Sequence, residues 1–330
     1  MTDAVLKNVS SFNNDPILHA TWLYYQEGLS QTEVAKLMGV SRVTVVKYLQ
    51  TAREKGLVQI NLDLNTFSSI DRALAIKEKF SLERVVIVPD GEHVNQREDS
   101  KLMRERLARA GGMYLNQVVE SGDVLGVAWG RTIHQMSEVM TPKTCKNVTV
   151  MQMLGSMPAQ PDFTTIEASS QLAHKLSGSV VSLHVPAVVS SSRLAVELQA
   201  EPIIRANFDA LTHCNKALFV VGNALDENPL IRVGVLSKKE MQNYRELGAV
   251  GVICGRFYDR LGRPVVADID FRILGISLAQ LRQVERRIFL AGGQRNYDAT
   301  LGAILGGYVS DLIIDEGTAE FLVNANIHTI

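Results

Sequence analysis

Residues 30–49, SQTEVAKLMGVSRVTVVKYL, constrain this 330-residue chain most, because they read as two short helices joined by a glycine. Ser30 and Glu33 have the spacing of a capping box, which predicts where the first helix begins. Gly39 suits the left-handed backbone that ends a helix, and Ser41 suits the cap of the next one. The segment therefore predicts a helix-turn-helix.

Apolar residues recur at helical spacing in both expected helices. The expected buried positions are Val34, Ala35, Leu37 and Met38 in the first helix, and Val45, Tyr48, Leu49 and Ala52 in the second. The remaining positions face outward. We predict that DNA contacts come from Gln31, Thr32, Ser41, Arg42, Val43, Thr44, Lys47 and Gln50.

The outward side chains suit a major groove. Arginine can pair with guanine, glutamine with adenine, and valine or threonine can touch a thymine methyl. Lys47 can neutralise a phosphate. The whole chain has a net charge of −1, so DNA binding must rest on such a local patch. The alternative is a helical hairpin inside a core, and the spacing of Ala35, Gly39, Val40 and Val45 favours the helix-turn-helix.

The flanking residues extend this interpretation. Residues 15–29 predict a supporting helix that packs through Ile17, Trp22, Leu23 and Tyr25. Residues 57–62 alternate and predict a short strand, and residues 67–80 have helical periodicity. We expect a DNA-binding domain at 1–64, a linker helix at 65–80 and a larger domain at 81–330.

The larger domain alternates strand-like runs with helical segments. The runs occupy residues 84–89, 124–129, 148–154, 180–186, 217–222, 265–271, 286–292 and 311–316. They lack strict polar alternation, which is typical of strands buried on both faces of a parallel sheet. We predict an α/β fold with a doubly wound sheet, whose ligand lies beyond the carboxyl ends of the strands.

Several motifs resemble one known family in the same order along the chain. They are LSQTEVAKLMGVSRVTVVKYLQTAREKGLVQI, LERVVIVP, GVAWGRTI, AVGVICGRFYDRLGRPV and AGGQRNYDATLGAILGGYVSDLIIDEGTAEFL. This set resembles the SorC family of sugar-responsive transcription regulators. The resemblance implies an effector domain related in fold to sugar-phosphate isomerases, deaminases and CoA transferases. It also implies dimers or tetramers that regulate carbohydrate or polyol catabolism, more often as repressors, under control of a sugar, polyol or sugar phosphate.

Effector contacts are expected from loops that follow strands. Gly130, Arg131 and Thr132 precede a helix, where backbone amides favour an anion and Arg131 could add a charged bond. The alternative is that Gly130 only turns the chain and Arg131 pairs at the surface. The other expected contacts are Gly155, Ser156, Gly292, Gly293, Arg295, Asn296 and Asp268.

Two departures from the family pattern bear on the effector. Met157, Pro158 and Ala159 supply few donors after Ser156, and Asn296 stands where relatives often carry a lysine. Since a phosphate needs several donors or cations, we hypothesise an unphosphorylated sugar or polyol. Asp268 and Asp270 are expected on one side of a strand, where Asp268 could accept sugar hydroxyls.

Other features narrow the function classes. No apolar run reaches the roughly 20 residues of a membrane span, and no secretion signal is evident. Three widely separated cysteines fit a reducing cytoplasm. The histidines lack metal-ligand spacing, and we expect no metal and no cofactor. An isomerase-like or deaminase-like enzyme with a DNA-binding head is the alternative function, although no convincing acid–base set is evident.

Overall fold

The computed structural model describes residues 15–58, 71–89, 96–157 and 165–326. The chain divides into two compact units, Met1–Leu62 and Asp63–Ile330. Among the described residues, no helix has the length and apolar character that crossing a bilayer requires.

Within its described residues, 15–58, the smaller unit contains three helices, α2 (Pro16–Tyr25), α3 (Gln31–Met38) and α4 (Arg42–Glu54). Asp15 caps α2 by accepting from the Ile17 backbone N–H at 2.8 Å. The helices bury one small apolar core, formed by Ala20, Leu23, Val34, Ala35, Val45 and Leu49.

Two packing expectations in this unit are wrong, since Trp22 is 46% and Leu37 is 59% exposed. At about 100° per residue, Leu37 lies roughly 110° from the centre of the stripe through Val34, Ala35 and Met38. Trp22 is similarly displaced from the buried side of α2. A core this small can cover only the centre of each stripe.

The segment between the units falls partly outside the described residues. Residues 59–62 of the expected strand and 65–70 of the expected linker helix are not described, and Leu57 and Val58 are not in a strand. Helix α6 (Asp71–Phe80) packs on β1 (Arg84–Val88) and α16 (Glu316–Asn324). The Lys79 ammonium donates to the Leu322 and Val323 carbonyls at 3.0 and 2.8 Å, which anchors α6 within the larger unit.

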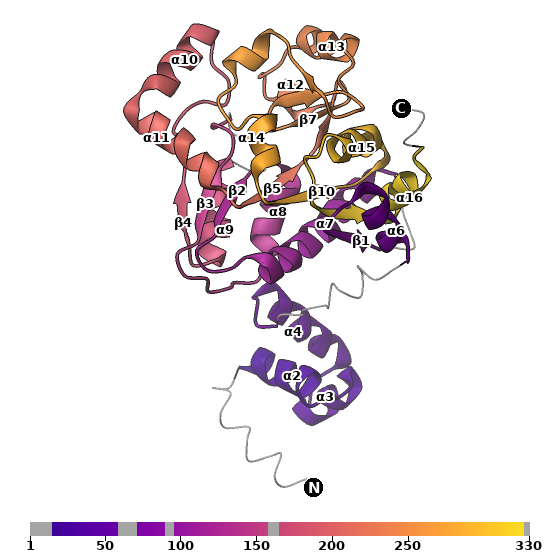
Figure 1. The fold of residues 1–330 in the computed structure, drawn as a ribbon. Helices are drawn as coiled ribbons and strands as arrows, with labels where there is room; N and C mark the ends of the chain where they lie inside the picture. Colours follow the sequence, from indigo (N-terminus) through magenta and orange to yellow (C-terminus); the bar gives the residue numbers. More distant parts are fainter. Residues whose placement is uncertain (1–14, 59–70, 90–95, 158–164, 327–330) are drawn as a thin grey trace. The chain divides into compact units, whose positions relative to one another are not determined.

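The larger unit is built on a seven-stranded parallel sheet with the order β1-β11-β10-β5-β2-β3-β4 (Figure 1). Its other strands are β2 (Val124–Val127), β3 (Thr149–Gln152), β4 (Ser179–Val181), β5 (Lys216–Val220), β10 (Arg286–Ala291) and β11 (Asp311–Asp315). Seven of the eight expected strand-like runs contribute to this sheet. The predicted α/β fold with a doubly wound parallel sheet is confirmed.

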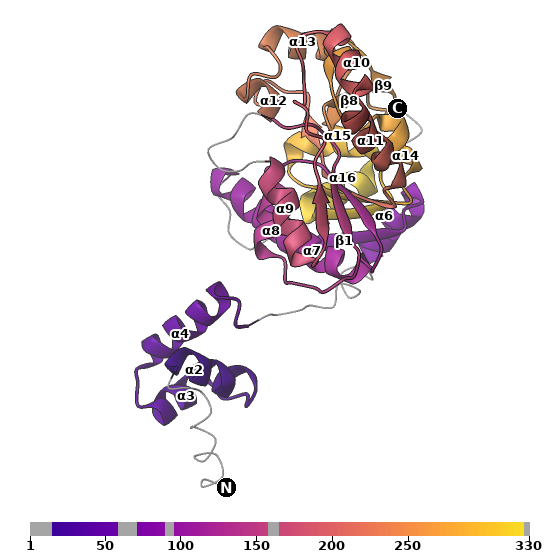
Figure 2. The ribbon, with the colours of Figure 1, turned by 90° about the vertical axis from the view of Figure 1, so that its left-hand side faces the viewer.

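Helices cover the sheet, and Figure 2 shows α8 and α9 together on one side of the strands. The long helix α7 (Gln96–Val118) packs on α8 (Arg131–Val139), and α8 packs on α9 (Thr165–Lys175). The other helical segments that the structure describes include α10 (Ser192–Ala200), α11 (Pro202–Ala210), η2 (Leu211–His213), α12 (Pro229–Arg232), α13 (Lys238–Glu246), α14 (Leu278–Gln283), η4 (Gln294–Asn296) and α15 (Tyr297–Leu305).

A second, antiparallel sheet was not predicted. It comprises β6 (Gly222–Asn223), β7 (Gly251–Ile253), β8 (Arg256–Tyr258) and β9 (Pro264–Val265). The strand expected at 265–271 is wrong, because the chain leaves β9 and forms the 3-10 helix η3 (Asp268–Arg272). The Asp270 carboxylate accepts from the Ala267 backbone N–H at 2.9 Å, which closes that turn.

Candidate DNA-reading helix and effector site

Helix α4 separates an apolar inner face from a polar outer face. Val45 and Leu49 are 0% and 1% exposed, whereas Val43 is 66% exposed. Arg42, Lys47 and Gln50 are also exposed, and Thr44 is half-buried. The inner face is therefore held to α2 and α3, while the outer face is open to a partner.

Local hydrogen bonds explain where the two helices begin and end. Ser30 and Glu33 form the predicted capping box, and Gly39 adopts the left-handed conformation with φ 66°. The Ser41 hydroxyl accepts from the Thr44 backbone N–H at 3.1 Å and contacts the Thr44 hydroxyl at 2.8 Å. The hydroxyls of Ser41 and Thr44 are thus engaged in capping the start of α4.

Neighbouring side chains orient the polar face of α4. The Arg42 Nε donates to Gln31 Oε1 at 3.3 Å, so the first helix of the pair steadies the second. Gln50 Nε2 donates to Glu54 Oε1 at 2.9 Å. Both contacts are exposed, and exchanging them for contacts with a ligand would cost little. Thr32 is exposed on α3 and follows Gln31 in the sequence.

Apart from Asp268, the expected effector residues lie beyond the carboxyl ends of three strands. Gly130 follows β2 and caps α8, Gly155 and Ser156 follow β3, and residues 292–296 follow β10. Strand β5 separates β10 from β2, whereas β2 and β3 are neighbours. The loops after β2 and β3 therefore adjoin, and the loop after β10 lies one strand further away.

The backbone N–H groups of the loop after β3 already donate to carbonyls within the protein. The Gly155 N–H donates to the Leu274 carbonyl at 2.9 Å, and the Ser156 N–H donates to the Val185 carbonyl at 2.8 Å. A Cβ on Gly155 would stand 2.6 Å from the Pro186 carbonyl oxygen, so only glycine fits here. These two amides are not free to bind an anion.

The loop after β10 is also internally bonded. The Gly293 N–H donates to Asp315 Oδ2 at 2.8 Å. Asn296 donates to the Gly292 carbonyl at 2.8 Å and accepts from Asn223 Nδ2 at 3.0 Å. Arg295 forms an ion pair with Glu227, and both side chains are 68% exposed. Asn296 is therefore directed toward the carboxyl end of β5, whereas Arg295 is directed to solvent.

The two expected carboxylates do not form a pair. The Asp268 side chain is 93% exposed and lies 3.5 Å from Arg272 Nε. The Asp270 side chain is 9% exposed, accepts from the Tyr244 hydroxyl and lies 3.6 Å from Arg256 Nη1. The expectation that both carboxylates face the same side of a strand is wrong, because η3 replaces the strand.

Two features near the carboxyl ends of the strands do not follow from the sequence pattern. A hollow of about 640 Å³ is lined by Ser156, His184 and Arg272 together with apolar side chains. Half-buried Arg104 on α7 has a lowered pKa, because burial and the positive charge of Arg131 both disfavour its protonated form. Ser156 and Arg131 had been predicted, whereas the contributions of His184, Arg272 and Arg104 depend on tertiary packing.

Two observations on the described residues concern reactive and metal-binding side chains. Burial raises the pKa of the Cys254 thiol to about 12, so it is not a nucleophile at neutral pH. Within the described ranges, no three potential His, Cys, Asp or Glu ligands gather as a metal site would require.

Comparisons with known proteins bear on both sites. Residues 65–324 match the family model described as "Putative sugar-binding domain". An "Uncharacterized transcriptional regulator YjhU" of Escherichia coli strain K12 is 80% identical over 96% of each chain. The "Deoxyribonucleoside regulator" of Bacillus subtilis strain 168 is 34% identical over 93% of this chain and 96% of its own.

A solved structure is similar across both units. The full-length sorbitol operon regulator SorC of Klebsiella pneumoniae has a TM-score of 0.75 and 22% sequence identity. The match covers 93% of this chain and 98% of that one.

Proposed function

The chain belongs to the SorC family of sugar-binding transcriptional regulators, and we propose that it reads operator DNA through α4 under control of a small effector. The outer face of α4 carries this proposal. Arg42, Val43 and Lys47 are exposed on it, while Val45 and Leu49 hold the helix to its own core.

In the proposed complex, the recognition helix lies in the major groove. Arg42 is placed to meet a guanine, Val43 a thymine methyl, and Lys47 or Gln50 the backbone or an adenine. Gln31 and Thr32 at the start of α3, together with the Ser41–Thr44 cap, lie where a helix-turn-helix meets phosphates.

One helix-turn-helix reads only a few base pairs, so we propose a homo-oligomer, a dimer or tetramer, that presents two readers to two half-sites. The effector changes DNA affinity only by binding one arrangement of the oligomer better than another. We propose that the protein acts in the cytoplasm, as a repressor whose effector releases DNA.

The effector is proposed to bind beyond the carboxyl ends of β2, β3 and β10, at Gly130, Arg131 and Thr132, the Gly155–Ser156 loop, and the segment from Gly292 to Asn296. Named relatives include a "Sorbitol operon regulator" and an "Erythritol catabolism regulatory protein EryD". Their names support a sugar or polyol class here. The internal bonding of the Gly155 and Ser156 amides supports an unphosphorylated effector, whereas Arg104 beside Arg131 supports a phosphorylated one.

A mobility-shift experiment tests the function. The probe is DNA from upstream of the protein's own coding sequence, with and without free sugars, polyols and their phosphates at equal millimolar concentrations. Specific retardation that one class reverses is expected. A thermal-shift panel with the same compounds tests the effector class, and stabilisation by phosphates alone would reject an unphosphorylated effector. No retardation by the wild type, or retardation unchanged by charge reversal at Arg42 and Lys47, would contradict DNA reading by α4.

Catalysis by the larger unit is not part of this proposal. The relatives are named as regulators, and the carboxylate pair that an isomerase-like reaction would have used is not formed. Incubation with pentose and hexose phosphates should give no turnover.

A further inference from the structure

Gln152 is a buried amide without hydrogen-bond partners. The residue is 2% exposed, and neither its Oε1 nor its Nε2 has a partner among the described residues. Native proteins pair the great majority of buried polar side-chain atoms, because an unpaired one retains the cost of losing water. An amide with both ends unpaired therefore indicates a site that is completed by something else.

The position of Gln152 follows from the sheet. It is the last residue of β3, so it stands at the carboxyl end where ligands of such folds bind. Helices α7 and α8 cover the sheet face to which Leu290 points. A Cβ added to Gly111 of α7 would stand 2.5 Å from Leu290 Cδ2 and 3.0 Å from Met136 Sδ of α8.

Strand register places Gln152 on that same face. Leu290 pairs with Val220, and Val127 pairs with both Leu218 and Gln152. Paired residues of neighbouring strands point to one face, and residues two apart on a strand do too. Gln152 is thus directed to the sheet face that α7 and α8 cover. Its own strand, β3, packs against α9, which adjoins α8.

Polar side-chain atoms on helices α7 and α8 are also buried and unpaired. Arg104 Nε on α7 and Gln135 Oε1 on α8 are also buried without a hydrogen-bond partner. The N-cap residue of α8 is Gly130, which offers no side chain to cap the first turn. Arg104 senses the charge of Arg131, so these groups gather near the first turns of α8.

We propose that Gln152 is a specificity-determining residue of the effector site and binds two adjacent hydroxyls of a sugar or polyol. A carboxamide donates through Nε2 and accepts through Oε1, which matches a vicinal diol, since each hydroxyl can both donate and accept. A phosphate dianion only accepts and would face Oε1 unfavourably, so Gln152 contacts the uncharged part of the effector. This inference rests on the proposed effector site and adds Gln152 to the residues that line it.

Gln152→Met tests the inference without knowledge of the effector. Methionine has a similar volume and no group that needs a partner. The unliganded variant should melt at least as high as the wild type, because replacing an unpaired buried amide by an apolar chain removes a penalty. Gln171→Met is the matched control. Gln171 Oε1 accepts from the Ser137 hydroxyl at 2.7 Å, so this variant should melt lower.

The ligand arm uses free pentitols, hexitols, aldoses and their phosphates in thermal shift and calorimetry. A compound that stabilises the wild type should bind Gln152→Met at least tenfold more weakly. A clearly lower melting temperature of unliganded Gln152→Met overturns the inference, as does equal effector affinity of variant and wild type. If no compound stabilises the wild type or alters its DNA binding, the proposed effector control fails in this panel, and the melting comparison still decides the role of Gln152.

Discussion

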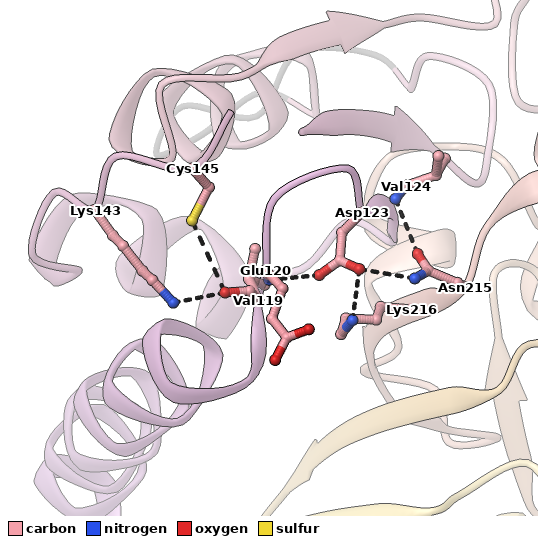
Figure 3. A network of polar contacts seen from close by, with 8 residues as sticks. All are labelled: Val119, Glu120, Asp123, Val124, Lys143, Cys145, Asn215 and Lys216. Carbon is pink, nitrogen blue, oxygen red and sulfur yellow. Dashed lines mark hydrogen bonds and ion pairs between the residues drawn. The ribbon is translucent and has the colours of Figure 1, made fainter. Parts of the chain in front are cut away.

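Lys216 and Asp123 form a buried ion pair at the amino ends of β5 and β2, with Nζ and Oδ1 2.6 Å apart and side chains 11% and 7% exposed. Figure 3 shows Asp123 at the centre of a network. Its carboxylate also accepts from Asn215 Nδ2 at 2.7 Å and from the Glu120 N–H at 2.6 Å. The pair lies at the opposite end of the strands from the proposed effector site.

Lys216→Met should lower the free energy of unfolding of the larger unit by about 3–5 kcal/mol, because it leaves a buried carboxylate without its cation. Urea denaturation followed by circular dichroism measures this loss. Lys239→Met, at an exposed position, is the matched control and should change stability by less than about 0.5 kcal/mol. A loss below 1 kcal/mol at Lys216 would show that the pair is replaceable by water.

Acid should destabilise the larger unit partly through Asp123. Burial raises the pKa of Asp123, but the Glu120 N–H, Lys216 and Asn215 lower it more, and the net pKa lies below its ordinary value. A depressed pKa in the folded state gives stability that is present above the unfolded pKa of about 3.9. That stability is lost as the pH falls through the lower folded value.

Urea titrations between pH 5 and pH 3 measure this dependence. Asp123→Asn should be less stable than the wild type at pH 5, and its stability should fall less steeply with acid. Parallel pH profiles for the two proteins would mean that Asp123 does not contribute.

Leu49→Ala should unfold the smaller unit selectively. Leu49 is 1% exposed in a core of few residues, so its truncation should cost about 2–5 kcal/mol and abolish DNA binding. Differential scanning calorimetry should show that the main transition of the larger unit is retained. Val43→Ala is the control on the same helix, since Val43 is 66% exposed and should affect DNA binding without affecting stability. Loss of the main transition in Leu49→Ala would be the contrary result.

The helix-turn-helix could be predicted because its signals are local. The capping box at Ser30 and Glu33, the left-handed Gly39 and the Ser41 cap each depend on neighbours within a few residues, and the structure has all three. The parallel strands could be predicted equally well, since continuous apolar runs mark strands that are buried on both faces.

The features that could not be predicted depend on contacts between residues far apart in the sequence. Strands β6 to β9 contain only two or three residues each, too few for any periodicity to show. Asp270 turns the chain into η3 through a bond to Ala267, which the alternating sequence does not reveal. The isolation of Gln152 is a property of the helices that cover it, and the sequence of β3 alone gives no sign of it.

Two glycines should respond differently to alanine. In Gly155→Ala the new Cβ would meet two backbone carbonyls at 2.6 Å, so strand-end loops must shift, and we expect a loss of at least about 2 kcal/mol in urea denaturation. Gly39→Ala meets nothing within 4 Å, and its positive φ alone should cost about 1 kcal/mol. Equal losses at the two positions would contradict this distinction.

The salt dependence of DNA binding by Lys47→Ala tests the outward placement of α4 most directly. Fluorescence anisotropy with the upstream DNA fragment, repeated over a range of salt concentrations, gives the slope of log affinity against log salt. Removing one phosphate contact should weaken binding and flatten this slope by about one unit. Lys239→Ala in the larger unit is the control and should leave it unchanged. A Lys47→Ala slope equal to that of the wild type would contradict the assignment of α4 as the DNA-reading helix.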